Sequence, residues 1–203
     1  GGDVLRNHRV VNSTEMSTGL DRGTLNSVTL DTLAGASVEE ASSLTGELIG
    51  GILEVGDLLG KGGMGVVYQV FHREWNRQLA MKVPLTLGEQ EGFDLKRWVR
   101  EAHTWIDLGL HPRVVSCWFV RQWKGVPILF LDLYSGGSLK ERLENRTGPL
   151  STPEEWGKAL TWLIHACEGL QHAHQMGLVH RDIKPANLLF NSEDNLAVTD
   201  FGL

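Results

Sequence analysis

The sequence predicts an α+β fold in which a small antiparallel sheet is followed by a mainly helical part. Between residues 52 and 133, short segments rich in β-branched and aromatic residues are separated by glycine-rich or polar turns. From residue 138 onward, helix start signals and helical spacing of apolar residues dominate. Runs of strands followed by runs of helices are typical of α+β proteins, so we expect a sheet and a separate helical layer.

The first 52 residues differ in composition from the rest of the chain. They contain no Phe, Trp or Tyr and are rich in Gly, Ser and Thr. Such a segment buries too little apolar surface to offset its ordering entropy, so residues 1–52 are expected to be a flexible lead-in. Ser37 and Glu40 have capping-box spacing, which allows one weak helix. A regulatory tail whose hydroxyl groups become phosphorylated is the alternative.

Five strands and one inserted helix are expected next. The helix covers residues 93–108, where Trp98 and Trp105 lie on helical spacing, and His111-Pro112 ends it. Lys124-Gly125 is expected to turn between the last two strands. The predicted strands are residues 52–59, 66–70, 78–83, 114–122 and 127–133.

The second part begins after a linker at Ser135-Gly136-Gly137. Ser138 and Glu141 form a capping-box pair that opens a short helix, and Thr152-Pro153-Glu154-Glu155 opens a longer one that ends near Gly177. A short hairpin over residues 188–199 follows. The residues expected to be buried on one stripe of the longer helix are Trp156, Leu160, Leu163, Ile164, Cys167 and Leu170.

Composition excludes several function classes for this 203-residue chain. The net charge is −6 without a block of Lys and Arg, so no nucleic-acid binding is expected. No apolar run reaches the roughly 18 residues of a membrane segment. Cys117 and Cys167 are expected to be buried free thiols in a reducing, cytoplasmic compartment. His172 and His174 lack the further ligands that a zinc site needs.

Residues 60–65 form a glycine loop that indicates a phosphate site. The residues are Gly60, Lys61, Gly62, Gly63, Met64 and Gly65, in the pattern G-x-G-x-x-G. Two unrelated folds use this pattern: a Rossmann loop opens a helix, whereas here a strand-like segment, Val66-Val67-Tyr68, follows. We therefore expect a hairpin whose backbone N–H groups approach phosphate oxygens closely.

Lys82 lies inside an apolar strand segment, Leu79–Val83. A buried ammonium group is costly unless an anion compensates it, so Lys82 requires a phosphate or a carboxylate nearby. The alternative is a lysine at the edge of the sheet whose ammonium group reaches water.

The run His180-Arg181-Asp182-Ile183-Lys184-Pro185-Ala186-Asn187, followed by Asp200-Phe201-Gly202, is the most specific pattern in the chain. With the glycine loop and Lys82 in the matching order, it resembles a eukaryotic-like Ser/Thr protein kinase of the type common in bacteria. The resemblance covers residues 53–203 and implies a kinase-like fold. That fold has a five-stranded ATP-binding lobe with helix C at residues 53–134 and a partial, mainly helical lobe at residues 135–203.

The resemblance implies a role for each polar residue of these motifs. Asp182 accepts or orients the substrate hydroxyl, and Lys184 approaches the γ-phosphate. Asn187 and Asp200 hold Mg²⁺. Lys82 binds the α- and β-phosphates of ATP and pairs with a glutamate of helix C, which is Glu101 or, as the fallback, Glu91. Arg181 meets a phosphate on the activation loop, and His180 packs under Phe201.

The resemblance also implies an adenine site around the linker. Leu131 corresponds to the gatekeeper, and the Asp132 carbonyl and the Tyr134 N–H bond the edge of the base. Val67 and Ala80 cover the base from above, and Leu189 lies below it.

The function expected from this pattern is transfer of the ATP γ-phosphate to Ser or Thr hydroxyls of a protein substrate, with Mg²⁺. Because the sequence ends at Leu203, the activation segment is absent, and we expect an incomplete fragment that is inactive alone. A pseudokinase, or nucleotide-binding scaffold, is the main alternative, and a small-molecule kinase is disfavoured by Lys184 and Asp-Phe-Gly. The interpretation requires Lys82 to lie within about 10 Å of Asp200.

Overall fold

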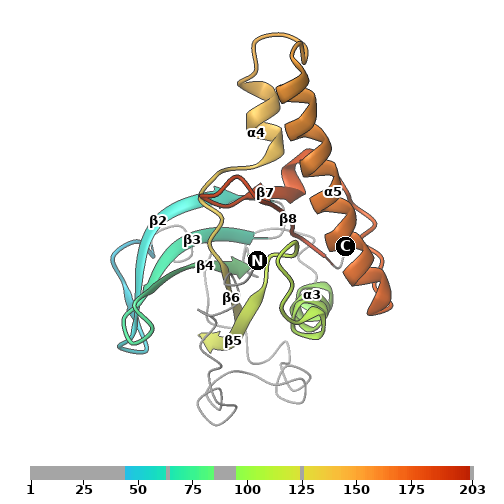
Figure 1. The fold of residues 1–203 in the computed structure, drawn as a ribbon. Coiled ribbons are helices and arrows are strands. Elements are labelled where there is room, and N and C mark those ends of the chain that lie inside the picture. Colours follow the sequence, from blue (N-terminus) through green and yellow to red (C-terminus); the bar gives the residue numbers. More distant parts are fainter. Residues whose placement is uncertain (1–43, 63–64, 85–94, 124–125, 202–203) are drawn as a thin grey trace.

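The computed structural model describes residues 44–62, 65–84, 95–123 and 126–201. A curved antiparallel sheet forms the first part, with the order β1-β2-β3-β4-β6-β5 (Figure 1). Strands β1 to β4 are neighbours in the order of the chain, whereas β6 lies between β4 and β5, and a helix is inserted between β4 and β5 in the sequence. The strands are β1 (Leu48–Ile49), β2 (Leu53–Lys61), β3 (Gly65–His72), β4 (Arg77–Pro84), β5 (Cys117–Trp123) and β6 (Val126–Asp132).

The five predicted strands are confirmed, and β1 is an addition that lies in the segment predicted to be a flexible lead-in. That prediction is wrong for residues 44–52, because Leu44 and Ile49 are buried against the cluster that contains Leu53. Ile52 is partly buried against the same cluster, and composition averaged over 52 residues hides these three apolar side chains. The helix expected at Ser37 lies outside the described residues.

One helix, α3 (Leu95–Leu108), packs against β5 and β6. Its buried face carries Trp98, Ala102 and Trp105, and the indole N–H of Trp98 donates to the backbone oxygen of Pro127 at 2.8 Å. The residues predicted to recur every three or four positions therefore form the helix face that covers the sheet.

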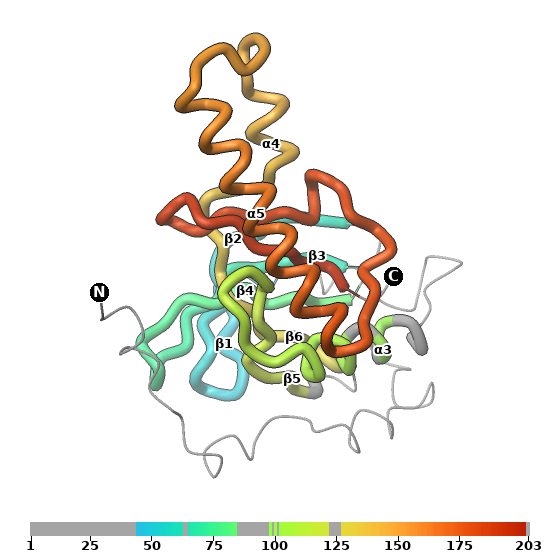
Figure 2. The backbone as a smooth tube through the Cα atoms, turned by 45° about the vertical axis from the view of Figure 1, so that its right-hand side comes forward, coloured from blue at the N-terminus to red at the C-terminus, as the bar shows by residue number. Residues whose placement is uncertain are grey.

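The second part contains two helices, a short 3₁₀ turn and a hairpin among its described residues. Both capping boxes are confirmed: Ser138 pairs with Glu141, and Thr152 pairs with Glu155. Gly177 has a φ of +76°, a left-handed conformation that favours glycine at a helix end. The elements are α4 (Leu139–Glu144), α5 (Pro153–Gln175), η2 (Pro185–Asn187), β7 (Leu188–Phe190) and β8 (Leu196–Val198). The two helices, α4 and α5, lie side by side (Figure 2).

Backbone hydrogen bonds join the β7–β8 hairpin to both parts of the molecule. The linker after β6 is fixed where the Gly136 N–H donates to the Phe190 oxygen at 2.7 Å. The segment after α3 is fixed where the Val115 N–H donates to the Val198 oxygen at 2.9 Å. One hydrophobic cluster then continues from α3 and β6 through the hairpin to α5.

The stripe predicted to be buried on α5 is wrong. Trp156, Leu160, Leu163 and Ile164 are each more than half exposed, Cys167 is exposed and only Leu170 is partly buried. The face that packs on the hairpin instead carries His165, Ala166, Gly169 and Ala173. These residues are smaller because α5 approaches the backbone closely: a Cβ atom on Gly169 would lie 2.3 Å from the Arg113 oxygen.

Within the described residues, no helix combines the length and the apolarity that a membrane span requires.

Candidate active site

The glycine loop joins two antiparallel strands, as predicted. Gly60 pairs with Val67 and Lys61 pairs with Val66, and the Gly62 N–H donates to the Gly65 oxygen at 2.8 Å. Gly63 and Met64, at the tip, lie outside the described residues. The loop opens no helix, which excludes the Rossmann alternative.

Gly65 shows why this turn requires glycine. A Cβ atom there would lie 2.5 Å from the Val83 oxygen, closer than atoms can approach. The glycine therefore lets β3 lie directly against the end of β4, which carries Lys82.

Lys82 on β4 is buried, and its ammonium group contacts an acid that is 118 residues away in the sequence. Its Nζ lies 2.9 Å from Asp200 Oδ1, within the 10 Å that the sequence interpretation required. The same nitrogen lies 5.6 Å from the Trp98 ring centre and 5.0 Å from that of Trp105. A carboxylate and two indole faces thus compensate the buried charge.

Glu101 is located on α3, between the two tryptophans in sequence. Its side chain lies outside the described part of the chain, so the pairing of Lys82 with Glu101 remains a prediction. The fallback, Glu91, also lies outside it.

The segment before η2 forms a compact set of polar contacts around Asp182. Lys184 Nζ donates to Asp182 Oδ2 at 2.7 Å, and Asn187 Nδ2 donates to the Asp182 backbone oxygen at 2.9 Å and to Oδ2 at 3.3 Å. The hydrogen bond from Lys184 is the main cause that holds the pKa of the Asp182 carboxyl below its usual value. Asp182 is therefore an ionised acceptor at neutral pH.

A second set of contacts fixes the position of Asp200. His180 Nε2 lies 2.8 Å from the Thr199 oxygen, and the Thr199 N–H donates to the Asn187 oxygen at 3.0 Å. The ring centres of His180 and Phe201 lie 4.6 Å apart, which confirms the predicted packing of this histidine.

Two non-glycine residues of this site have left-handed backbone conformations. Arg181 has a φ of 65° and Asp200 a φ of 61°, each at a cost of roughly 1–2 kcal/mol. Such conformations persist where the surroundings over-determine them, and they cluster at functional sites.

Asn187 and Asp200 fit the chemistry of a magnesium ion. Asn187 is buried and its amide nitrogen bonds Asp182, which fixes the amide so that its oxygen is the atom able to bind a metal. Asp200 adds a carboxylate that is partly open to solvent. Oxygen atoms of this kind are the ligands that Mg²⁺ prefers.

The apolar residues predicted to enclose adenine lie in one cluster. Ala80 and Leu131 are buried and pair across β4 and β6, while Val67 and Leu189 are partly buried against the same cluster. Val67 comes from the sheet and Leu189 from the hairpin, so the cluster receives side chains from both parts. Asp132 ends β6, and burial raises the pKa of the nearby Tyr134 hydroxyl to about 12.

Sequence reasoning placed Trp98 and Trp105 on the spacing of one helix but did not relate them to Lys82. Their spacing of seven places both on one face of the helix that follows the strand of the buried lysine. It also missed Arg77 and Trp118, whose side chains both contact Asp132. No local signal relates these two residues, which are distant from Asp132 in the sequence.

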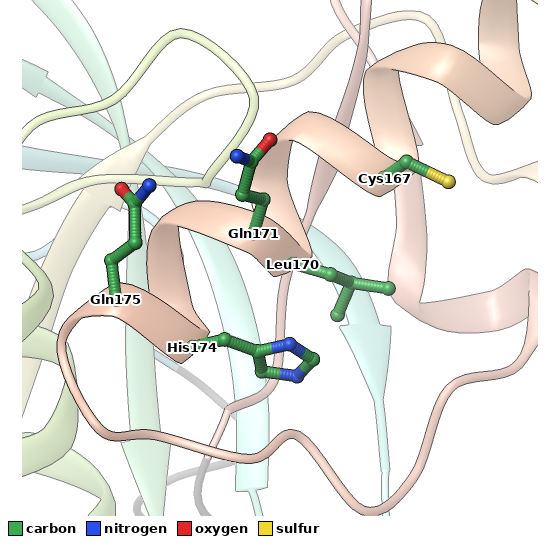
Figure 3. Close-up of a pocket in the computed structure, with 5 residues that line it drawn as sticks. All are labelled: Cys167, Leu170, Gln171, His174 and Gln175. Carbon is green, nitrogen blue, oxygen red and sulfur yellow. The ribbon is translucent and has the colours of Figure 1, made fainter.

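A depression on α5 lies apart from these residues (Figure 3). None of its lining residues belongs to the predicted site. They are Cys167, Leu170, Gln171, His174 and Gln175, all from the last turns of α5.

Among the described residues, no group of three or more His, Cys, Asp and Glu is arranged to hold a metal ion. His172 instead stacks on His111, with ring centres 4.5 Å apart. Cys117 is a partly buried free thiol, as expected, whereas the prediction of burial for Cys167 is wrong because that side of α5 is exposed.

Comparison with known proteins agrees with this geometry. The family model described as "Protein kinase domain" matches residues 53–203. The chain is 32% identical over 160 residues to the serine/threonine-protein kinase PrkC of Bacillus subtilis, which covers 79% of this chain and 24% of the relative. It is 31% identical over 155 residues to the serine/threonine-protein kinase PknB of Mycobacterium leprae, which covers 74% and 24%.

The described residues combine a curved antiparallel sheet with a buried lysine that contacts the acid of Asp-Phe-Gly. The chain belongs to the protein kinase family. It spans about a quarter of the length of these two bacterial Ser/Thr kinase relatives.

Proposed function

We propose that the protein containing this chain transfers the γ-phosphate of ATP to Ser or Thr hydroxyls of a protein substrate. The observation that carries the proposal is the 2.9 Å contact between Lys82 Nζ and Asp200 Oδ1. It joins a strand of the sheet to the segment after the hairpin, so phosphate and metal ligands face one site. The names of the relatives, serine/threonine-protein kinases, support the same reaction.

Binding of the triphosphate is assigned to the glycine hairpin and to Lys82. Backbone N–H groups between Gly60 and Gly65 approach the phosphate oxygens, and the Lys82 ammonium neutralises part of their charge. Because Lys82 is already held by Asp200 and two indole faces, it does not need to leave water when the nucleotide binds. Glu101 is assigned as the helix partner of Lys82.

Orientation of the attacking hydroxyl is assigned to Asp182. Its ionised carboxylate accepts a hydrogen bond from the substrate Ser or Thr, and Lys184, 2.7 Å from Asp182 Oδ2, is available to the transferring phosphoryl group. Asn187 and Asp200 are the residues assigned to Mg²⁺, which neutralises phosphate charge when bound. Phosphoryl transfer needs little else from the protein than this positioning.

Recognition of adenine is assigned to the cluster formed by Val67, Ala80, Leu131 and Leu189, with the Asp132 carbonyl and the Tyr134 N–H at the edge of the base. We place the boundary between the ATP-binding part and the catalytic part after residue 134, where β6 ends and the linker begins. A protein substrate and a cytoplasmic location complete the proposal.

Phosphate transfer to a generic Ser/Thr protein tests this function in the full-length protein. Lys82→Met is expected to lower the rate about 100-fold or more, the size typical for loss of one charge-stabilising group. Lys140→Met is the control, because Lys140 is exposed and contacts only the neighbouring Glu144 among the interactions described. Its rate should equal that of the wild type.

Two outcomes would contradict parts of the proposal. Wild-type protein that binds Mg-ATP without incorporating phosphate would support the scaffold alternative. A Lys82→Met variant with unchanged activity would show that another group anchors the phosphates.

A further inference from the structure

The side chain of Asp132 is held from two directions at the end of β6. Arg77 donates from one guanidinium nitrogen to Asp132 Oδ1 at 2.7 Å, and the indole N–H of Trp118 donates to the same oxygen at 2.7 Å. The Asp132 side chain is only 21% exposed, and the bond from Trp118 is partly buried, whereas the bond from Arg77 is exposed. A charge-assisted bond and an indole bond on one oxygen leave this side chain little freedom.

Trp118 reaches Asp132 because of an irregularity in β5. Cys117 pairs with Leu131 and Phe119 pairs with Phe130, the residue next to Leu131. Trp118 is therefore an extra residue in β5, a β-bulge without a partner of its own in β6. Bulges of this kind change the direction of a side chain and occur beside active sites. Here the bulge directs an indole N–H along the sheet to the end of the neighbouring strand.

Arg77 is positioned by Trp118 as well as by Asp132. Its guanidinium carbon lies 4.2 Å from the Trp118 ring centre, and Arg77 begins β4, which pairs with β6 up to Leu79 and Asp132. The planar guanidinium group of an arginine can stack on an aromatic ring and at the same time donate hydrogen bonds to a nearby carboxylate. The three side chains therefore form a closed set, in which each contacts the other two.

The backbone of the same residue is held too. The Asp132 N–H donates to the Ser116 oxygen at 3.0 Å, two residues before the bulged tryptophan. The peptide before Asp132 is thus fixed to the residue that precedes β5, and the Asp132 side chain is held by residues of β4 and β5. With its N–H and its side chain both held, only rotation about the Cα–C bond is left to orient the Asp132 carbonyl.

We propose that Arg77 and Trp118 are positioning residues that fix the Asp132 carbonyl and thereby determine selectivity for adenine over guanine nucleotides. This inference rests on the proposed function, in which that carbonyl accepts a hydrogen bond from the amino group of adenine. Guanine carries a carbonyl oxygen at the corresponding ring position, so a fixed Asp132 carbonyl repels it. A carbonyl free to rotate would lose the bond to adenine and relieve the repulsion of guanine.

Equilibrium binding of the magnesium complexes of non-hydrolysable ATP and GTP analogues to the full-length protein tests this inference. Arg77→Gln and Trp118→Phe should each weaken ATP-analogue binding about threefold to tenfold, because part of a charge-assisted hydrogen bond is lost. GTP-analogue binding should stay the same or tighten, so the preference for adenine falls. Asp132→Asn, which keeps the shape and an acceptor oxygen, should have an intermediate effect.

Two controls carry matched substitutions at positions that do not contact Asp132. Arg73→Gln removes an arginine of the turn between β3 and β4 that pairs with Glu54, and Trp156→Phe changes an exposed tryptophan of α5. Both should keep the wild-type preference. Thermal unfolding of each variant separates loss of fold from loss of selectivity.

The outcomes distinguish this inference from the proposed function. Wild-type protein that prefers the ATP analogue, with the same preference in Arg77→Gln and Trp118→Phe, would overturn the inference alone. Equal weakening of both analogues would show a general effect on the site and would also overturn it. A wild type that binds neither analogue would overturn the proposed function and this inference together.

Discussion

Lys82 is compensated by several groups at once, which explains how a lysine can occupy the interior of an apolar strand. Asp200 supplies the opposite charge, while Trp98 and Trp105 supply ring faces. A cation near an aromatic face gains about 0.5–2 kcal/mol, the larger values applying where water is excluded. These contacts keep the ammonium group of Lys82 beside Asp200, in the segment that follows the β7–β8 hairpin.

The protonation of the Asp182 carboxyl depends on the neighbouring Lys184. Lys184→Met removes the main cause that holds the pKa of the Asp182 carboxyl below its usual value. The pKa should therefore rise toward the ordinary aspartate range, so that the ionised fraction falls between roughly pH 3 and pH 5. A carbon NMR titration of the Asp182 carboxyl measures this directly.

The control for this titration is Lys158→Met, an exposed lysine of α5. It should leave the Asp182 titration unchanged. An identical Asp182 titration in the wild type and in Lys184→Met would show that the contact between the two side chains does not form in solution.

At the scale of elements, α5 is defined at its start by local chemistry and along its length by tertiary contact. Thr152, Pro153 and Glu155 specify where the helix begins, and the capping box forms as the sequence predicts. Its buried face is decided by the close approach of the Arg113 backbone and the β7–β8 hairpin. The largest apolar residues of the helix consequently lie on the other side.

Gly169 and Gly157 are expected to respond in opposite directions to the same substitution. Gly169→Ala places a Cβ atom 2.3 Å from the Arg113 oxygen and 3.1 Å from a Val198 methyl group, so it should cost about 1–3 kcal/mol of unfolding free energy. Gly157→Ala meets no atom within 4 Å and should stabilise the helix by up to about 1 kcal/mol. Chemical denaturation of both variants checks the two signs, and equal effects would contradict the packing of α5.

At the scale of the whole molecule, the sheet and the hairpin share one hydrophobic cluster. Residues of α3, β6, β7, β8 and α5 all contribute to it. The polar site lies where these elements meet, since Lys82 comes from the sheet and Asp200 from the segment after the hairpin. The positions of Lys82 and Asp200 are thus set by the same packing.

The exposed apolar face of α5 predicts that the 203-residue chain on its own associates with itself. Trp156, Leu160, Leu163 and Ile164 form a continuous stripe, and exposed patches of this kind promote association in water. Replacing Leu160 and Ile164 together by Glu should remove the concentration dependence of sedimentation. Thr161→Glu with Gln175→Glu adds the same charge at polar positions and should not. Wild-type chain that sediments as a monomer at all concentrations would contradict this prediction.

Much of the fold and site was predictable because the signals are local or belong to a specific motif. The capping boxes, the glycine hairpin and the packing of His180 on Phe201 formed as expected. The strand β1 was missed because three apolar residues disappear in the average composition of a long polar segment. The contacts of Trp118 and Arg77 with Asp132 were missed because they join residues of three different strands.

The sequence by itself determined the family motifs and where most helices and strands begin, because motifs, caps, turns and alternation act over a few residues. Only the tertiary structure decided which face of α5 is buried, what surrounds Lys82 and what holds Asp132. Periodicity identifies a face of an element without naming its neighbour. The neighbour is set by close packing between segments as far apart as Lys82 and Asp200, and no short stretch of sequence contains that information.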